Sequence, residues 1–356
     1  MKRRQFLANA SLLTVTSALS FLGKNAFAQT VVPLNVVAEI KKLRVNSGIF
    51  TGAYLIAPAG RINWYFTNLG ILPIVQYLNA ADLDLYIRTY LDLYLRRVEA
   101  NSSIQDINFS TTPDGAFQLV LADSDDSYAA TTLSLVARYL HASKNWAWWD
   151  ANKAKLKTMA YRNLAVAVKP NGLTSVFQSP RSQTNSVGYL MDNCEVYRGL
   201  RDFAALLRER GETQDAAYYD SFATNITQRI SNSLFDVARG GFMPSDADLF
   251  ATEVFYAGTT CQAFPQAFGL TELAPYFDRG WAYLNRLSPN WQDGRYDAYP
   301  WAVLSFVAAK RGATSQAQTH MQMINTKFVT DRGLVTINEL GFYQRASSLL
   351  AGRADI

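Results

Sequence analysis

Apolar residues recur at helical spacing along most of the chain after residue 33, and alternation of the β-strand type is scarce. The pattern predicts an entry helix at 34–44 and a last helix from about residue 338, with five pairs of helices between them. These pairs are 61–79 with 81–99, 125–142 with 149–168, 187–210 with 213–234, 247–268 with 273–287, and 297–311 with 314–327. Successive pairs start about 50–60 residues apart, a period that is typical of helical-hairpin arrays.

The two helices of each pair differ in character. First members are apolar nearly all round, as in YAATTLSLVARYL, whereas second members keep one polar face, as in DAAYYDSFATNITQRISNSLF. A helix that is apolar all round is buried, and an amphipathic helix faces water on one side. We therefore expect an all-α fold in which six inner and six outer helices close into an (α/α)6 toroid. An open solenoid or an irregular bundle is the alternative.

Links within a pair are short, but links between pairs are long and rich in glycine, proline, asparagine and aromatic residues. Long connections gathered on one face are where sites tend to be built. The inner helices should begin at the same end, which would bring together the acidic residues near their starts. These are Asp123, Asp125 and Asp126, then Asp192 and Glu195, then Asp246 and Asp248, with Asp293 and Asp297 as a fourth group.

The first 28 residues have the features of an export signal. They combine a basic start, a mildly apolar middle and an Ala26-Phe27-Ala28 ending, and Arg3-Arg4 indicates the twin-arginine route. We expect residues 29–356 to form a single domain of a periplasmic or secreted bacterial protein. An ordinary secretory signal is the alternative. No other stretch is long and apolar enough to span a bilayer.

Charge and side-chain counts exclude several classes of function. The formal charge is +5, but four of the 34 basic residues lie in the signal, so 30 remain against 29 acidic residues. A nucleic-acid partner would need a basic face, which this balance does not favour. Two histidines argue against a histidine-rich metal site. Cys194 and Cys261 could form a disulfide or remain buried thiols. We expect a monomer that uses no metal and no cofactor.

Two short stretches carry a family resemblance. Residues 123–133, DSDDSYAATTL, resemble the signature of glycoside hydrolase family 8, in which two aspartates one residue apart open an inner helix. Residues 192–200, DNCEVYRGL, are similar to inner-helix openings of several six-hairpin families, including unsaturated glucuronyl hydrolases. The chain thus resembles the six-hairpin glycosidases. It lacks the family 8 acid glutamate near the first inner helix and the tryptophan that ends the signature, so the resemblance implies the fold but no catalytic pair.

Glycoside hydrolysis needs two carboxyl groups that flank the scissile bond, and neither a metal nor a histidine. Asp125 and Asp126 lie where a helix dipole keeps a carboxylate ionised, so we predict one of them as the base and Asp123 as a helix cap. Glu195 follows Asp192 by one turn in apolar surroundings, which favours a proton donor. The predicted substrate contacts are Arg61, Asn63, Trp64, Tyr65, Phe177, Arg181, Tyr189, Trp291, Tyr296 and Tyr299, with Trp301 beside them.

Three functions fit these observations. The first is an exported glycoside hydrolase that cleaves a polysaccharide or oligosaccharide by carboxylate acid/base catalysis. The second is a polysaccharide lyase in which a tyrosine is the base and an arginine or asparagine neutralises a uronate. The third is a non-catalytic toroid that binds glycan during the production or export of a polymer.

Overall fold

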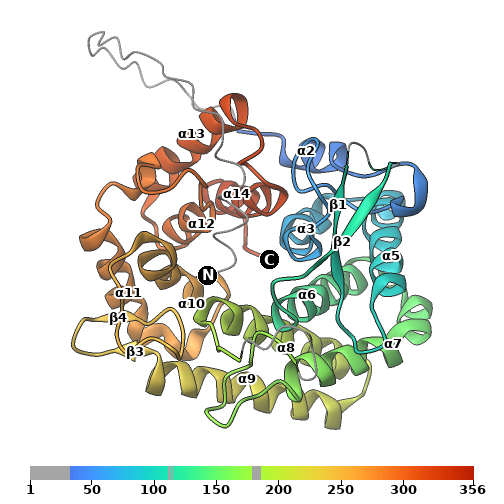
Figure 1. The fold of residues 1–356 in the computed structure, drawn as a ribbon, viewed down its shortest axis with the longest axis horizontal. Coiled ribbons are helices and arrows are strands. Elements are labelled where there is room, and N and C mark those ends of the chain that lie inside the picture. Colours follow the sequence, from blue (N-terminus) through green and yellow to red (C-terminus); the bar gives the residue numbers. More distant parts are fainter. Residues whose placement is uncertain (1–32, 111–112, 114, 179–185) are drawn as a thin grey trace.

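The computed structural model describes residues 33–110, 113, 115–178 and 186–356, and helices dominate them. Six inner elements surround a common axis (Figure 1). Each contacts the next along the chain, and the sixth contacts the first. They are α3 (Trp64–Ile71), α6 (Asp126–Ser143), α8 (Leu190–Glu209), α10 (Phe264–Ala267), α12 (Val303–Lys310) and α14 (Ile337–Leu350). The expected mostly helical class is confirmed.

A second set of helices lies outside this ring (Figure 1). Five of these outer helices each follow an inner element in the chain. The sixth, α2, lies near the start of the described chain and packs on α14. The backbone N–H of Ile337 also donates a 2.7 Å hydrogen bond to the carbonyl of Ile56. Early and late parts of the chain therefore lie side by side. The outer helices are α2 (Val36–Lys42), α5 (Thr89–Arg97), α7 (Trp146–Ala160), α9 (Thr213–Ser233), α11 (Ala274–Leu287) and α13 (Thr314–Thr330).

Short helical segments join or extend the long helices. The outer layer before α5 begins with α4 (Ala80–Asp82) and a π-helical turn, η3 (Leu83–Arg88). The other short segments are η1 (Gly48–Phe50), η2 (Leu72–Tyr77), η4 (Tyr161–Ala165), η5 (Phe255–Thr259), η6 (Thr260–Ala263), η7 (Thr271–Leu273) and η8 (Trp291–Asp293). The helices are therefore shorter and more broken than the apolar pattern predicted.

Two predicted helices are wrong at their starts. Residues 247–254 contain no helix, and the predicted 247–268 segment is helical only from η5 to α10. A Cβ on Gly258 would lie 2.3 Å from the carbonyl oxygen of Thr252, so the chain doubles back closely there. The predicted 297–311 helix begins only at Val303. Pro300 disfavours helical geometry in the residue before it, and Trp301 has φ +56°.

Glycines set the closest approaches between inner helices. A Cβ on Gly199 of α8 would lie 2.5 Å from the carbonyl oxygen of Ala130 in α6. A Cβ on Gly70 of α3 would lie 2.6 Å from the carbonyl oxygen of Ile337, and one on Gly341 of α14 would lie 2.5 Å from that of Leu69. Real Cβ atoms do not approach a carbonyl oxygen so closely, so the ring closes tightly only because these positions lack side chains.

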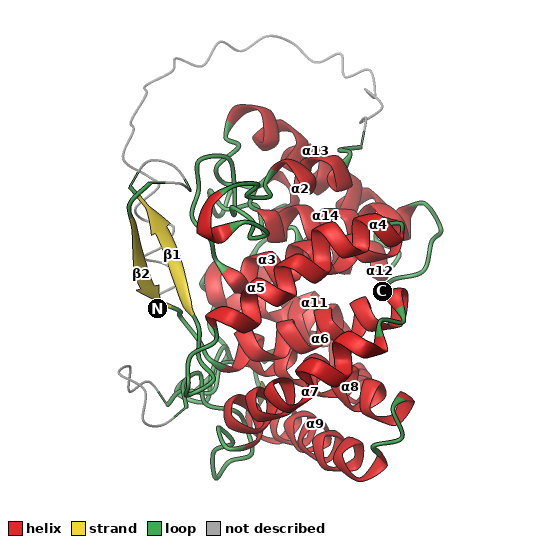
Figure 2. Cartoon of the chain, turned by 90° about the vertical axis from the view of Figure 1, so that its right-hand side faces the viewer, coloured by secondary structure: helices red, strands yellow, loops and turns green. Residues whose placement is uncertain are grey.

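Two small hairpins lie in the long connections. β1 (Gln105–Phe109) pairs antiparallel with β2 (Phe117–Leu121), with Ile107 opposite Leu119, and β3 (Phe235–Asp236) pairs with β4 (Gly241–Phe242). Ile62 bridges to Ile107, which places the neighbouring Asp106 beside the start of α3. Figure 2 shows the first hairpin at one end of the helices and the C-terminus at the other. We call these the front and rear ends.

Three further expectations meet the structure here. Cys194 and Cys261 are both buried free thiols, so the thiol alternative is confirmed. In the part of the chain that the structure describes, no helix is long and apolar enough to cross a membrane. The predicted export signal, 1–28, lies outside the described residues.

Candidate functional site

Two cavities lie on either side of the middle of the ring. The front cavity is about 50 Å³ and is lined near the starts of α3, α12 and α14, whereas the rear cavity is about 260 Å³ and is lined by the later turns of α6 and α8. Leu69 and Phe342 line both cavities. Tyr65, in the front cavity, donates a 2.5 Å hydrogen bond to Oε1 of Glu195, which lines the rear cavity. These side chains form the partition.

The front cavity combines carboxylates, aromatic rings and a cation. Asp123 reaches it just ahead of α6, and Glu339 reaches it from the first turn of α14. These two elements are not neighbours in the ring, because α3 lies between them. The other lining residues are Arg61, Asn63, Tyr65, Phe66, Leu69, Phe264, Tyr299, Trp301, Val303, Asn338 and Phe342. The cavity is concave and has a few convergent polar groups, as ligand sites do, but its volume of about 50 Å³ is well below their usual range.

Glu339 is a buried carboxyl group held by hydrogen bonds. Its Oε2 accepts a hydrogen bond from the backbone N–H of Ala302, and its Oε1 accepts one of 3.3 Å from Asn338. Burial raises the pKa of Glu339 to about 7, although the hydrogen bonds from Ala302 and Tyr299 oppose the rise. Desolvation thus outweighs the polar contacts. The group keeps its proton up to about neutral pH and can donate it.

A second buried carboxyl group, Asp106, supports the site from beneath. Its Oδ2 accepts hydrogen bonds of 2.6 Å from Asn63 and 2.8 Å from Tyr128, and its Oδ1 accepts one of 3.3 Å from the backbone N–H of Trp64. Burial raises the pKa of Asp106 to about 7, Arg61 opposes the rise, and Asp123 adds to it. Arg61, Asp106 and Asp123 therefore interact electrostatically at the mouth of α3.

Asn63 has a structural role in this arrangement. Its side-chain oxygen accepts a 2.8 Å hydrogen bond from the N–H of Phe66 and so caps α3. Its amide nitrogen donates to both Asp106 and Tyr128. The predicted contact Asn63 therefore fixes the start of α3 and orients the residues around it.

Trp301 forms an aromatic wall with an unusual backbone. Its φ is +56°, in the left-handed region that bulky residues rarely adopt. The indole N–H donates a 3.0 Å hydrogen bond to Asp297. The ring stacks on that of Tyr256, with 4.7 Å between the ring centroids and 21° between the ring planes. Such backbone outliers persist where the surroundings hold them, often at functional sites. Tyr299 packs edge-on against this ring and bonds to Asn338.

The predicted catalytic acids form a buried cluster behind the front cavity. The pKa of Asp126 lies well above its usual range because of burial and then because of the negative charges of Asp192 and Glu195. Its Oδ2 accepts a 2.9 Å hydrogen bond from Thr174. Asp126 and Glu195 thus lie close together, as expected. Neither Asp125 nor Asp126 nor Asp192 lines either of the two cavities.

The prediction that Asp123 caps α6 is wrong. The N-cap of α6 is Asp125, whose side chain makes no capping hydrogen bond, and Oδ1 of Asp126 accepts a 2.8 Å hydrogen bond from the N–H of Ser127. Oδ2 of Asp125 instead accepts a 3.1 Å hydrogen bond from the backbone N–H of Gln178, which ties α6 to the following long connection. Asp123 is left to face the front cavity.

The predicted substrate contacts separate into several groups. Arg61, Asn63, Tyr65 and Tyr299 meet in the front cavity, with Trp301. Trp64 and Trp291, expected as stacking platforms, are at most 1% exposed and pack in the interior. Phe177 and Tyr189 line neither of the two cavities, and Tyr296 stacks on Phe255 at the surface. Arg181 lies outside the described residues.

Sequence reasoning missed Glu339 and Asp106. Glu339 could have been found, because it occupies the first turn of an inner helix exactly as Asp126 and Asp192 do. Asp106 gave no comparable signal. It lies in a long connection for which the apolar pattern predicted neither a helix nor a strand. Within the described residues, no cluster of three or more histidine, cysteine, aspartate or glutamate side chains could hold a metal ion.

Comparisons with known proteins identify the fold but no family. No protein-family model matches the sequence, and no curated protein resembles it in sequence. A rhamnosidase from Klebsiella oxytoca with rhamnose bound is similar in structure, with a TM-score of 0.59 at 12% identity over 89% of this chain. This chain spans 62% of that rhamnosidase. A glycosidase variant has a TM-score of 0.59 at 13% identity over 90% of this chain and 96% of its own. The chain therefore has a glycosidase-like helical fold.

Proposed function

We propose that this protein is an exported glycoside hydrolase built on a six-hairpin (α/α)6 toroid, with its active site in the front cavity. One observation carries the proposal. Asp123 and Glu339 line the same cavity from elements separated by α3, and glycoside hydrolysis uses two carboxyl groups that flank the scissile bond. The likeness of the fold to glycosidases and the export-type N-terminal sequence support it.

The two carboxyl groups have different surroundings and take different roles. Glu339 is 2% exposed and its raised pKa keeps a proton available near neutral pH, so it acts as the general acid that protonates the leaving oxygen. Asp123 is only half-buried and lies near Arg61, so it acts on the opposite side of the sugar as the carboxylate that activates water or attacks the anomeric carbon. Water then supplies the new hydroxyl group.

Aromatic walls and the partition would hold the sugar between these groups. Trp301 and Tyr299 present rings beside Glu339, and Tyr65 closes the floor through its hydrogen bond to Glu195. Apolar ring faces pack against the C–H faces of a sugar, while Arg61 and Asn338 offer polar contacts at its edge. The buried cluster of Asp126, Asp192 and Glu195 fixes Tyr65 from behind.

The proposal is tested with a panel of polysaccharides and oligosaccharides, with products identified by mass spectrometry. We expect a product that has gained one water molecule, and its formation should cease in Asp123→Asn and Glu339→Gln. Asp331→Asn and Glu253→Gln are matched controls, because both side chains are exposed and line neither cavity. Unchanged turnover in Glu339→Gln would exclude this carboxyl group as the acid.

The same panel separates the other two functions. A product with a new carbon–carbon double bond, formed without uptake of water and absorbing in the ultraviolet, would assign a lyase. In that case Tyr65, which already hydrogen-bonds a carboxylate, is the tyrosine to replace. Binding of a glycan without any product, unaffected by Glu339→Gln, would assign a binding protein.

A further inference from the structure

The larger of the two cavities lies at the rear end and is not used by the proposed reaction. It opens to solvent past His141 and Glu209, whose side chains are 69% and 38% exposed. Apolar side chains, including Leu69, Leu72 and Phe268, form one part of its wall. At about 260 Å³ it is slightly below the usual range of ligand sites, so it suits a molecule of the size of a monosaccharide.

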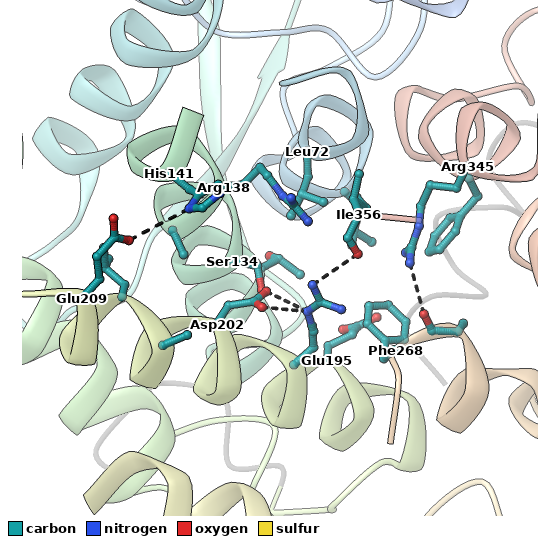
Figure 3. Close-up of a pocket in the computed structure, with 18 residues that line it drawn as sticks. Leu72, Ser134, Arg138, His141, Glu195, Asp202, Glu209, Phe268, Arg345 and Ile356 are labelled. Carbon is teal, nitrogen blue, oxygen red and sulfur yellow. Dashed lines mark hydrogen bonds and ion pairs between the residues drawn. The ribbon is translucent and has the colours of Figure 1, made fainter. Parts of the chain in front are cut away.

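Three arginines from three inner helices line this cavity (Figure 3). Arg198 of α8 binds Asp202 through both carboxylate oxygens, at 2.9 and 2.8 Å. Arg345 of α14 binds Asp355 in the same way, at 2.9 and 2.8 Å. Arg138 of α6 makes no hydrogen bond or ion pair within the described residues, and Figure 3 shows it pointing into the cavity.

The carboxylates around Arg138 are already engaged by other groups. Asp202 is bound to Arg198, and Glu209 binds Lys144 at 2.9 Å. Glu195 accepts the hydrogen bond from Tyr65. Burial lowers the pKa of Arg138, the positive charges of Arg198 and Arg345 lower it further, and the carboxylates of Asp202 and Asp355 oppose the change. Arg138 is therefore a partly buried cation without an ion pair in the described part of the chain, and a bound anion would offset the cost of burying it.

The chain itself shows which anion fits. Asp355 enters the rear cavity region and occupies the fork of Arg345, with Lys310 at 3.5 Å. The main-chain oxygen of Ile356 accepts a 3.3 Å hydrogen bond from Arg198, and Ile356 lines the cavity. The groups that satisfy the arginines in this structure are thus planar carboxylates, which match the planar fork of a guanidinium.

We propose that the rear cavity binds a small carboxylate of sugar size, whose carboxyl group pairs with Arg138 and whose body packs on the apolar wall. This site is separate from the proposed active site, because the partition of Tyr65, Leu69 and Phe342 lies between the two cavities. A sugar acid meets both requirements, with one planar carboxylate and a ring of suitable size.

Isothermal titration calorimetry with glucuronate and glucose tests this site, because the two sugars differ mainly in the carboxylate. We expect glucuronate to bind the purified protein at least about tenfold more tightly than glucose. Arg138→Gln should weaken glucuronate binding by at least about tenfold, the usual scale for loss of one charge-assisted pair. Arg162→Gln is the matched control, since Arg162 is an exposed arginine outside both cavities.

A second variant guards against misfolding of Arg138→Gln. Asp355→Asn removes the internal competitor and frees Arg345, so glucuronate should bind it more tightly than the wild type. A gain in affinity cannot result from a damaged fold. Equal binding by the wild type and Arg138→Gln, or no binding of glucuronate at all, would overturn the proposal. The proposal would also be overturned if glucuronate binding were lost in Asp123→Asn and kept in Arg138→Gln, because glucuronate would then bind in the front cavity. Tighter binding of inorganic phosphate than of glucuronate would overturn the carboxylate assignment.

Discussion

At the scale of single residues, burial decides what the carboxyl groups at the front end can do. Asp106 and Glu339 are each 2% exposed, and the pKa of each is raised to about 7 although each accepts several hydrogen bonds. Below about pH 7 these two carboxyl groups are therefore largely protonated, and they lie around a half-buried Asp123. A protonated acid beside an accessible carboxylate is the division of roles that glycoside hydrolysis needs.

The buried carboxyl group of Asp106 makes stability depend on pH. Its folded pKa of about 7 lies above the unfolded value of 3.8, so between these pH values only the folded protein retains the proton. The free energy of unfolding of the wild type should therefore fall, relative to Asp106→Asn, by up to about 1.4 kcal/mol per pH unit as pH rises from about 4 to 7. Above about pH 7 the difference should become constant.

Urea unfolding of both proteins across this pH range measures the difference. Comparing the two proteins cancels other groups, such as the buried His320, whose lowered pKa of about 3 gives the opposite slope. Asp331→Asn, which removes an exposed carboxyl group, is the control and should not reproduce this slope. Parallel curves for the wild type and Asp106→Asn would show that Asp106 is ionised throughout.

If Glu339 is the general acid, kcat should fall as pH rises through about 7, where its proton is lost. Glu339→Gln should lower kcat by about 10²–10⁴-fold, the usual contribution of general acid catalysis. Turnover of the best substrate from the panel, measured from pH 5 to 9, tests both expectations, with Glu253→Gln as control. An activity that rises through pH 7 would instead make Glu339 the base.

The sequence allowed part of the site to be predicted. Arg61, Asn63, Tyr65 and Tyr299 were expected at the front end because they lie beside inner-helix starts, and they do meet there. Trp64 and Trp291 lie in similar sequence positions but point into the interior. The sequence of a connection does not reveal which way its side chains point. That direction decides whether an aromatic side chain faces a cavity or packs in the interior.

At the scale of elements, close contact between inner helices depends on glycine. Alanine normally favours a helix over glycine by about 1 kcal/mol. At Gly199, however, a Cβ would lie 2.5 Å from Ala130 O and 2.6 Å from Ala130 Cα, both backbone atoms. We therefore expect Gly199→Ala to lower the free energy of unfolding by about 1–3 kcal/mol, the usual cost of overpacking. Urea unfolding monitored by circular dichroism measures it.

Gly333→Ala is the control for this prediction. No atom lies within 4 Å of a Cβ built on Gly333, so its stability should stay within about 0.5 kcal/mol of the wild type. If Gly199→Ala were as stable as the wild type, α6 and α8 would have room to separate, and tight glycine packing would not be what holds them.

The long helices were easier to predict than the short ones. α6, α8, α9, α13 and α14 agree with the apolar pattern to within a few residues. The prediction of one continuous helix at 247–268 failed. This apolar run includes Gly258 and Pro265 and folds as three short helical segments, η5, η6 and α10. Apolarity all round marks a segment as buried but does not require it to be one continuous helix.

At the scale of the whole molecule, the ring gives the protein two chemically different ends. Residues at the starts of α6 and α14 supply Asp123 and Glu339 to the front cavity, and residues further along the inner helices supply Arg138, Arg198 and Arg345 to the rear cavity. This polarity follows from the hairpin order, in which each outer helix returns the chain to the front end.

The contact between α14 and α3 also predicts how disturbance spreads. In an open array of repeats the ends fray independently, whereas here α14 contacts α3 and each of the six inner elements has two neighbours. Gly341→Ala places a Cβ 2.5 Å from the carbonyl oxygen of Leu69 and so strains the α14–α3 contact. We expect hydrogen exchange to accelerate in α3, in α14 and also in α8 across the ring, because opening the contact removes support from both sides.

Hydrogen–deuterium exchange with mass spectrometry, resolved by peptide, distinguishes the two behaviours. In a closed ring, the amides of α8 lose protection in Gly341→Ala by a factor comparable to those of α3, while Gly333→Ala changes neither helix. If faster exchange were confined to α14, α3 and the adjoining α2, the contacts between first and last inner helices would not stabilise the rest. The fold would then behave as an open array whose ends merely touch.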